Sequence, residues 1–119
     1  MPRRYTSPDG FELLVGLDAA ENEKLSLRVA RSHDLWFHAH DCPGAHVLLR
    51  VPKGGRVSED DIHWAAGVAA WYSKQKGPGR VKVMCALGAD ISRGPPKSAK
   101  GTVTCMSNKI ISVRCVIPT

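Results

Sequence analysis

The sequence lacks several features that would place it quickly in a class of protein. It has neither GxGxxG nor GxxxxGK[ST], the glycine patterns of nucleotide-binding loops, and no spacing typical of a nucleophile and its base. No apolar run is long enough to cross a membrane, and no apolar segment follows the two arginines near the start as in a signal peptide. We therefore expect a cytoplasmic protein that is not an enzyme, binds no cofactor and does not associate with membranes.

The chain has four cysteines among its 119 residues. An even number would permit two disulfides, but there is no CxxC pair, and no secretory signal favours an oxidising compartment. We expect Cys42, Cys85, Cys105 and Cys115 to be free thiols, mostly buried as small apolar side chains.

Acidic residues are almost missing from the second half of the chain. Residues 1–61 carry 8 Lys/Arg and 10 Asp/Glu, a net charge of −2, whereas residues 62–119 carry 9 Lys/Arg and one aspartate, a net charge of +8. This asymmetry indicates either a polyanionic partner or a basic surface that only keeps the domain in solution. The charge distribution alone leaves both interpretations open.

The hydrophobic pattern predicts a single α+β domain over residues 1–119, with a mixed or antiparallel sheet of about five to seven short strands and two main helices. Pro8, Asp9 and Gly10 supply turn chemistry for an N-terminal hairpin. Ser58, followed by three acidic residues, is a typical helix start. The helices are predicted over 19–31 and from 58 to 74–76, and the later strands over 35–39, 45–51, 81–87, 102–106 and 111–116, with a tight hairpin at 107–109 joining the last two.

A dense group of metal-ligating residue types occurs in "DLWFHAHDCPGAHVLLR" (34–50). On one extended strand His38, His40 and Cys42 would point to the same face and could present three zinc ligands. A zinc-dependent hydrolase that uses these three residues together with His46 is therefore the alternative hypothesis. The group departs from the metallo-β-lactamase pattern HxHxDH, because its aspartate falls one place early, and the zinc deaminase pattern is missing as well.

The same stretch and its flanks resemble the NFACT-R family, the RNA-binding module of ribosome quality-control factors, which also occurs as a stand-alone protein. "YTSPDGFELLVG" (5–16) is similar to the family's Y-x-SPDG-x-x-ΦΦ-G hairpin, where Φ is apolar. "ARSHDLWFHAHDCPGAHVLLR" (30–50) is similar to its core, D-ΦWΦH-x-x-D-x-PG-x-HV-x-Φ. "AAGVAAWYSKQK" (65–76) resembles the family's Ala-rich helix, and "SRGPPKSAKGTV" (92–103) its Pro/Lys/Gly loop.

The resemblance covers nearly the whole chain and bears on both hypotheses. The family pattern includes His38 and His46 but leaves out His40 and Cys42, which disfavours the zinc set. The chain departs from the family at "VMCALGAD" (83–90), where a tyrosine and lysines are common. It also lacks the other domains of the full-length factors, so the resemblance does not imply tail synthesis.

The resemblance implies a monomeric RNA-binding domain that contacts tRNA or rRNA in a ribosome-associated or translation quality-control setting, with the large ribosomal subunit as a candidate partner. The sequence does not distinguish tRNA from rRNA, or RNA from DNA. Lysine and arginine would contact phosphates, and histidine and aromatic side chains would bind or stack on unpaired bases. A core position for the tryptophan at 36 is the competing interpretation. The predicted nucleic-acid-binding residues are Arg31, Asp34, Trp36, His38, His46, Arg50, Lys74, Arg93, Lys97 and Lys100.

Overall fold

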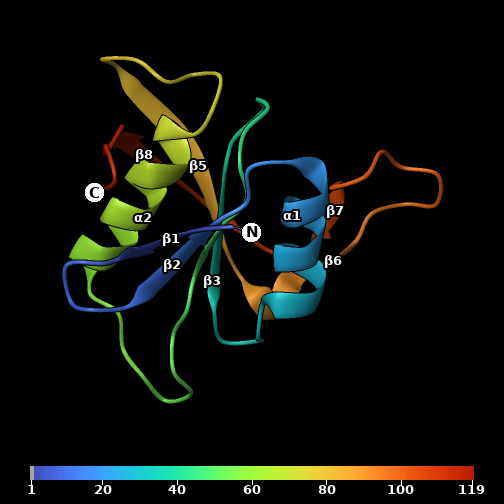
Figure 1. Cartoon of the computed structure of the whole chain (residues 1–119), viewed down its shortest axis with the longest axis horizontal. Coiled ribbons are helices and arrows are strands. Elements are labelled where there is room, and N and C mark those ends of the chain that lie inside the picture. The colour runs from blue at the N-terminus through green and yellow to red at the C-terminus, as the bar shows by residue number, and fades with distance from the viewer. Residues whose placement is uncertain (1) are drawn as a thin grey trace.

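The computed structural model describes residues 2–119 and consists of a central antiparallel sheet with elements packed on both faces (Figure 1). The helices are α1 (Ala19–Lys24), which continues into a π-helical turn, η1 (Leu25–Val29), and α2 (Glu59–Trp71). The strands are β1 (Arg3–Thr6), β2 (Glu12–Val15), β3 (Leu35–Ala39), β4 (Val47–Leu49), β5 (Arg80–Leu87), β6 (Ile91–Arg93), β7 (Val103–Cys105) and β8 (Lys109–Arg114). A short 3-10 turn (Gly88–Asp90) precedes β6.

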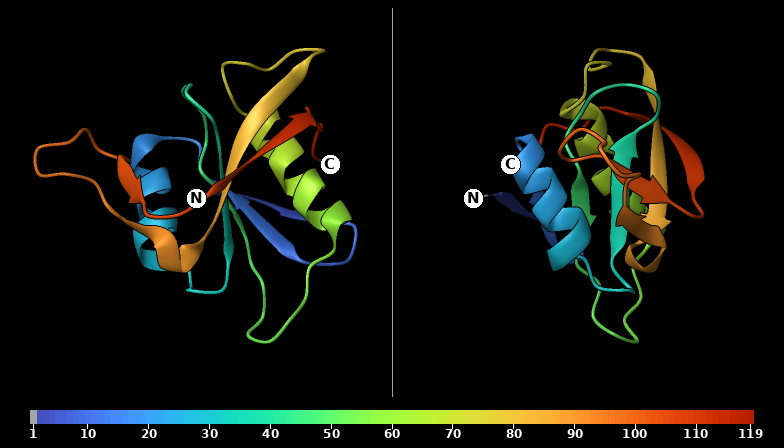
Figure 2. Two further views of the ribbon diagram at one scale, coloured as in Figure 1. Left: turned by 180° about the vertical axis from the view of Figure 1, so that it is seen from behind. Right: turned by 90° about the vertical axis from the view of Figure 1, so that its right-hand side faces the viewer.

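The main sheet has six strands in the order β1-β2-β4-β3-β5-β8, and β6 and β7 form a separate two-stranded sheet. Every strand pairing is antiparallel. α2 lies on one side of the main sheet, and α1 lies on the other side together with β6 and β7 (Figures 1 and 2). The predicted α+β architecture is therefore confirmed. None of the helices within residues 2–119 is long and apolar enough to span a membrane.

The first face of the main sheet, which α2 covers, contains the larger hydrophobic core. Alternate strand residues point toward α2, because successive side chains of a strand point to opposite faces. Phe37, Val47 and Leu49 are completely buried there. α2 contributes mainly alanines, which are short enough for the helix to approach the sheet closely. The alanines of α2 in this core are Ala65, Ala66, Ala69 and Ala70.

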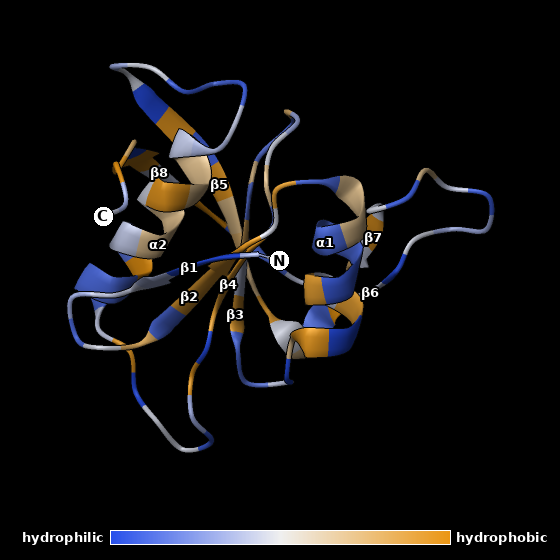
Figure 3. Cartoon of the chain, in the orientation of Figure 1, coloured by the Kyte–Doolittle hydropathy of each residue, from blue (hydrophilic) through white to orange (hydrophobic). Residues whose placement is uncertain are grey.

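The second face of the sheet is covered only in part. Leu14, Trp36, Leu48 and Ala86 pack there against Leu25 of η1 and Ile91 of β6, in a smaller hydrophobic cluster. The neighbouring outward positions of β3, β5 and β8 lie beyond these covering elements and carry a mixture of apolar, polar and basic residues. Figure 3 shows hydrophobic and hydrophilic residues alternating along β5. The candidate site lies on the part of the second face that these covering elements leave uncovered.

Both helices end earlier than predicted. α2 begins as expected, because Ser58 caps it and forms a reciprocal capping box with Asp61. Its end is set by pairing with the β3–β4 loop: the Ala45 N–H donates to the Tyr72 carbonyl (3.1 Å) and the Lys74 N–H to the Pro43 carbonyl (3.0 Å). α1 widens after Lys24 into η1, in which the Ala30 N–H donates to the Leu25 carbonyl (2.9 Å).

The hairpin predicted at 107–109 is wrong. β7 pairs with β6 in the small sheet, whereas β8 pairs with β5 at the edge of the main sheet. Residues 106–108 therefore cross from one sheet to the other, and the Met106 N–H donates to the Asp90 carbonyl (2.8 Å). The strand predicted over 45–51 is also shorter in the structure, since β4 spans only Val47–Leu49.

Candidate nucleic-acid interface

An open groove of about 840 Å³ lies on the second face, between the sheet, the start of α1 and the loop that joins β6 to β7. Trp36, His38 and His46 from β3 and the segment before β4 form its sheet side, with Met84 from β5. Lys100 approaches from the β6–β7 loop. The groove thus brings together four of the predicted nucleic-acid-binding residues, which lie up to 64 positions apart in the sequence (36 to 100).

The three rings of the groove pack against one another in fixed orientations. Trp36 and His38 are stacked, with centroids 5.9 Å apart and an interplanar angle of 14°. His46 meets both rings edge-on, at 5.2 Å from each. Trp36 is only 3% exposed, so it is a core residue, as the competing interpretation of this tryptophan held. From this buried position it packs against both imidazoles.

Ser26 of η1 bridges the buried ring nitrogens of Trp36 and His46. The Trp36 Nε1–H donates to the Ser26 hydroxyl oxygen (3.0 Å), and an indole can only donate. The same hydroxyl lies 2.6 Å from His46 Nδ1. If its proton is donated to Nδ1, both buried groups are satisfied, and a neutral His46 then carries its own proton on Nε2. His46 would thereby be held as a hydrogen-bond donor at its Nε2.

Both groove histidines favour the neutral form. Burial lowers the pKa of His38, although backbone hydrogen bonds with Ala39 and Gly44 oppose this shift. Burial, and then repulsion from a charged His38, lower the pKa of His46 to about 4, against a backbone hydrogen bond with Asn22. At neutral pH the pair can therefore bind by hydrogen bonding and stacking, and the positive charge must come from lysine and arginine.

Basic residues surround the groove, including two that the sequence analysis missed. Lys74 lines a neighbouring hollow that shares Asn22, Pro43 and Gly44 with the groove. On the other side of the β6–β7 loop, Arg93 and Lys100 line a hollow together with Lys24 and Arg28. The last two stand one helical turn apart on α1 and η1, a spacing of four residues that could have identified them.

Two predicted RNA-binding residues, Arg93 and Lys97, lie in different surroundings at the β6–β7 loop. The loop projects away from the body of the domain (Figure 2), and Lys97 occupies it in the left-handed backbone region with φ 66°. Arg93 lies at the end of β6 and donates to Glu23 of α1 (3.2 Å). Lys97 and Lys100 are therefore the exposed lysines of the loop, whereas Arg93 already has a carboxylate partner.

Arg31, Asp34 and Arg50 lie away from the groove, around the start of β3 and the end of β4. Asp34 is 1% exposed, and its carboxylate accepts hydrogen bonds from the Arg31 N–H (2.9 Å) and the Val51 N–H (3.0 Å). Arg50 Nε lies 3.0 Å from Asp34 Oδ2 as an ion pair, although the angle is not that of a hydrogen bond. This set joins two strand ends, and its role in nucleic-acid binding stays a prediction.

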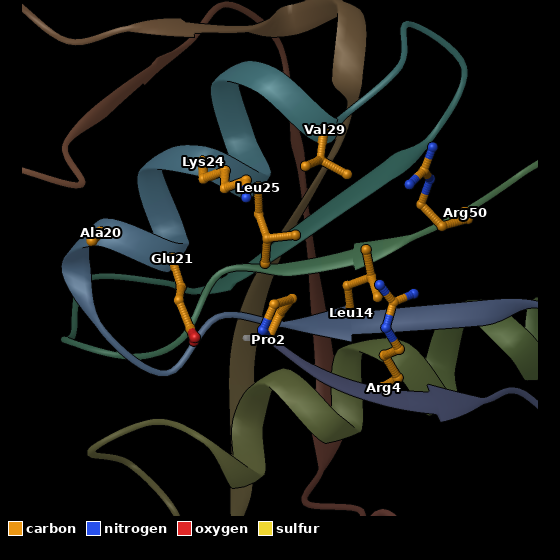
Figure 4. A pocket seen from close by; sticks show the side chains of 9 residues that line it. All are labelled: Pro2, Arg4, Leu14, Ala20, Glu21, Lys24, Leu25, Val29 and Arg50. Carbon is orange, nitrogen blue, oxygen red and sulfur yellow. The ribbon is translucent and has the colours of Figure 1, made fainter.

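A second cavity, of about 370 Å³, lies between α1 and the β1–β2 hairpin (Figure 4). Leu14, Leu25 and Val29 form its apolar part. Three cations line it, and two of them are paired with a carboxylate: Arg4 donates to Glu12 (2.7 Å), and Arg50 pairs with Asp34, while Lys24 also lines the hollow beside Arg93. This cavity is therefore less suited to phosphate than the surroundings of the groove.

The four residues of the zinc hypothesis do not form one ligand set. β3 ends at Ala39, and Asp41 takes a left-handed conformation (φ 54°), so the strand does not continue through Cys42 as that hypothesis required. Cys42 packs against the core of the first face, whereas His38 and His46 line the groove. Among residues 2–119 no three His, Cys, Asp or Glu side chains are arranged to hold a metal. All four cysteines are free thiols, but only Cys85 is buried, so the expectation that most of them would be buried is wrong.

Parts of this chain are similar in sequence to curated proteins from bacteria and animals. The chain is 40% identical over 79 residues to the "Rqc2 homolog RqcH" of Bacillus subtilis (strain 168), covering 66% of this chain and 13% of that protein. It is 42% identical over 50 residues to "Coiled-coil domain-containing protein 25" of Danio rerio, covering 42% of this chain and 23% of that one. The chain therefore spans less than a quarter of these relatives.

A solved structure has the same fold. The C-terminal part of the fibronectin/fibrinogen-binding protein from Streptococcus suis superimposes with a TM-score of 0.87 at 31% identity, over 97% of this chain and 45% of that one. Residues 1–106 match the family described as "NFACT protein RNA binding domain", a span that ends between β7 and β8. The chain belongs to the family of NFACT protein RNA-binding domains.

Proposed function

We propose that this chain binds RNA without catalysing a reaction, and that the groove around His38 and His46 is its contact surface. The observation that carries the proposal is the convergence of these two histidines and Lys100 on one groove in a member of an RNA-binding family. The lysines and arginines around the groove supply the charge that attracts phosphates.

Two features of the groove suit RNA with unpaired bases. The imidazoles are neutral at neutral pH and packed against Trp36. The half-buried His38 can stack on a base, whereas His46, which is only 7% exposed, is limited to a hydrogen bond with a base edge. The exposed Lys97 and the neighbouring Lys100 belong to a loop rich in glycine and proline, which can follow a phosphate backbone. A loop or junction of a tRNA or rRNA has both unpaired bases and closely spaced phosphates.

The proposed setting is translation quality control, with the chain acting as a cytoplasmic monomer on tRNA or ribosomal RNA. Its support is the similarity to proteins named as Rqc2 homologues, of which this chain spans only a small part. The activity of those complete proteins is not assigned to this chain.

A salt titration tests the contact surface. Lys97→Ala together with Lys100→Ala should weaken tRNA binding several-fold and flatten the log–log dependence of affinity on salt by roughly 1.5 units, for two lost phosphate contacts. Arg93 is left unchanged, because it is paired with Glu23. The matched control is Lys53→Ala with Arg56→Ala, two exposed cations of the β4–α2 loop. Equal slopes for the two variants would exclude the β6–β7 loop as the contact.

A further inference from the structure

The outward side chains of β5 and β8 form an open surface next to the groove. In β5, Val81, Val83 and Cys85 are buried toward α2, so the residues between them point to the second face. The antiparallel register places Ile110 opposite Met84, Ser112 opposite Lys82 and Arg114 opposite Arg80. We name these six residues the strand platform.

The strand platform continues the groove without interruption. The register of β3 and β5 places His38 opposite Met84, and both residues line the groove. One row of side chains therefore runs from His38 through Met84 to Ile110, which is 43% exposed. Neighbouring strands lie about 4.8 Å apart, so this row is roughly 10 Å long.

Cations flank the apolar row on one side. Lys82, Arg80 and Arg114 are exposed, and β5 and β8 contain no acidic residue. α1, η1 and the small sheet cover the other half of this face, over Trp36, Leu48 and Ala86. The strand platform thus offers an apolar strip with positive charge beside it and no carboxylate of its own strands to repel a polyanion.

An apolar row beside exposed cations suits an unpaired strand of nucleic acid better than a duplex. A nucleic-acid duplex buries the flat faces of its bases and exposes base edges and phosphates, so it would leave the row from His38 to Ile110 without a base face to stack on. An unpaired strand offers both flat base faces and phosphates, and proteins bind such strands by stacking bases on a sheet or groove beside a cationic track.

We propose that a single-stranded RNA segment crosses the sheet from the groove to β8, with bases on His38, Met84 and Ile110 and phosphates on Lys82, Arg80 and Arg114. This inference rests on the proposed function and extends its site along β5 and onto β8. The part in β8 lies beyond the span that matches the family, which ends at residue 106. The first base has a prepared surface, because Trp36 holds the His38 ring by stacking.

The test compares two RNA probes and two pairs of cations. The probes are a fluorescein-labelled oligouridylate of about 10 nucleotides, within the usual range of single-strand sites, and a tRNA transcript. Lys82→Gln with Arg114→Gln removes two charges of the strand platform while keeping polar side chains. Lys53→Gln with Arg56→Gln removes two charges elsewhere. Thermal unfolding of both variants checks that the fold persists.

We expect the strand-platform variant to bind the oligouridylate at least five-fold more weakly than the control variant, with a salt dependence flatter by about 1.4 units, the value for two contacts on a single strand. His38→Ala should add a further loss that His63→Ala, on the exposed side of α2, does not produce. Equal affinities of the two charge variants for the oligouridylate would overturn the strand platform.

The outcome also separates this inference from the proposed function. If wild-type protein binds tRNA, and the loop lysines matter for that binding, but it does not bind oligouridylate, the strand platform is rejected and the RNA-binding groove stands. If neither probe binds at low salt, both proposals fail together.

Discussion

The two faces of the main sheet are built from the same strands but differ in completeness. Toward α2 every interior position is apolar, and Phe37, Val47 and Val83 have no exposed surface. Toward α1 the buried cluster stops at Trp36 and Ala86, with the half-buried Met84 packed at its edge, and beyond it His38 is half-buried and Lys82 is exposed. Within β3 and β5, one set of alternate residues therefore stabilises the fold, and the part of the other set beyond Trp36 and Ala86 forms the surface available to a partner.

This difference predicts how substitutions on adjacent residues should separate. Changes on the face toward α2 should lower the stability of the fold, whereas changes on the open part of the other face should alter binding and leave the fold largely intact. Neighbouring residues of one strand can test this, because they share their backbone pairing and differ only in the face to which they point.

The largest effect is expected for Phe37→Ala, which should lower the free energy of unfolding by about 3–5 kcal/mol by leaving a cavity under α2. Met84→Ala, on the other face and half-buried, should cost only about 1 kcal/mol. Urea denaturation of both variants measures the contrast. Equal losses would show that the open face contributes to stability as much as the closed one.

An intermediate effect is expected from pH. A histidine in the unfolded chain titrates near 6.5, whereas the pKa of His46 in the fold is lowered to about 4 by burial and by the charge of His38. The unfolded chain therefore binds more protons than the folded one between these values. The contribution of His46 to stability is complete above pH 6.5 and falls as the pH is lowered toward 4, by a total on the order of 3 kcal/mol.

Denaturation curves at several pH values measure this loss of stability. Comparing substitutions of two histidines shows whether His46 causes it. His46→Gln should flatten the decline between pH 6.5 and 4. His63→Gln, on the exposed side of α2, should leave it unchanged. An unaltered decline in His46→Gln would mean that another group causes the acid sensitivity.

The smallest effect concerns the rate of thiol modification. Burial raises the pKa of Cys85 to about 11, with Lys109 opposing the shift and Glu59 adding to it, so this thiol should resist iodoacetamide at pH 8. Cys105 is partly exposed and lines the groove, so it should react, and bound tRNA should slow the reaction a few-fold. Peptide mass spectrometry reports both rates.

Two results would contradict these expectations. Rapid labelling of Cys85 would show that the face under α2 opens readily. A Cys105 rate that is indifferent to saturating RNA would place the bound RNA elsewhere. Labelling of the denatured, unreduced protein should find four thiols, in keeping with the free cysteines of the structure.

Features governed by local chemistry could be predicted from the sequence. The turn at Pro8, Asp9 and Gly10 forms as expected, with Gly10 at φ 95° and the Gly10 N–H donating to the Ser7 carbonyl (2.9 Å). Ser58 caps α2 because its side chain can satisfy a free N–H of the first turn. In both places the residues that decide the structure lie within a few positions of one another.

Features governed by distant pairing could not be predicted. β7 pairs with Ile91–Arg93 because η1 and the small sheet together cover Trp36 and Leu48, which is a property of the assembled face. The groove was predicted only as separate residues: His38, His46 and Lys100 were identified, but nothing local indicated that they would meet. Lys24 and Arg28 were not predicted, although their spacing of four residues on one predicted helix could have identified them.

The π-helical turn at Leu25–Val29 has a consequence for how this domain tolerates change. Leu25 packs into the cluster over Leu48, and the adjacent Ser26 reaches both Trp36 and His46, so two consecutive residues of one helix point inward. A π turn holds one residue more than the α-helical turn it replaces, and each residue of an α-helix turns the chain by about 100°. Deleting one residue of this turn after Ser26 would rotate Leu25 and Ser26 relative to the start of the next strand. The segment is thus constrained by its length as much as by its side chains. A variant shortened by one residue could keep either the packing of Leu25 in the cluster or the hydrogen bonds of Ser26 to Trp36 and His46, but not both.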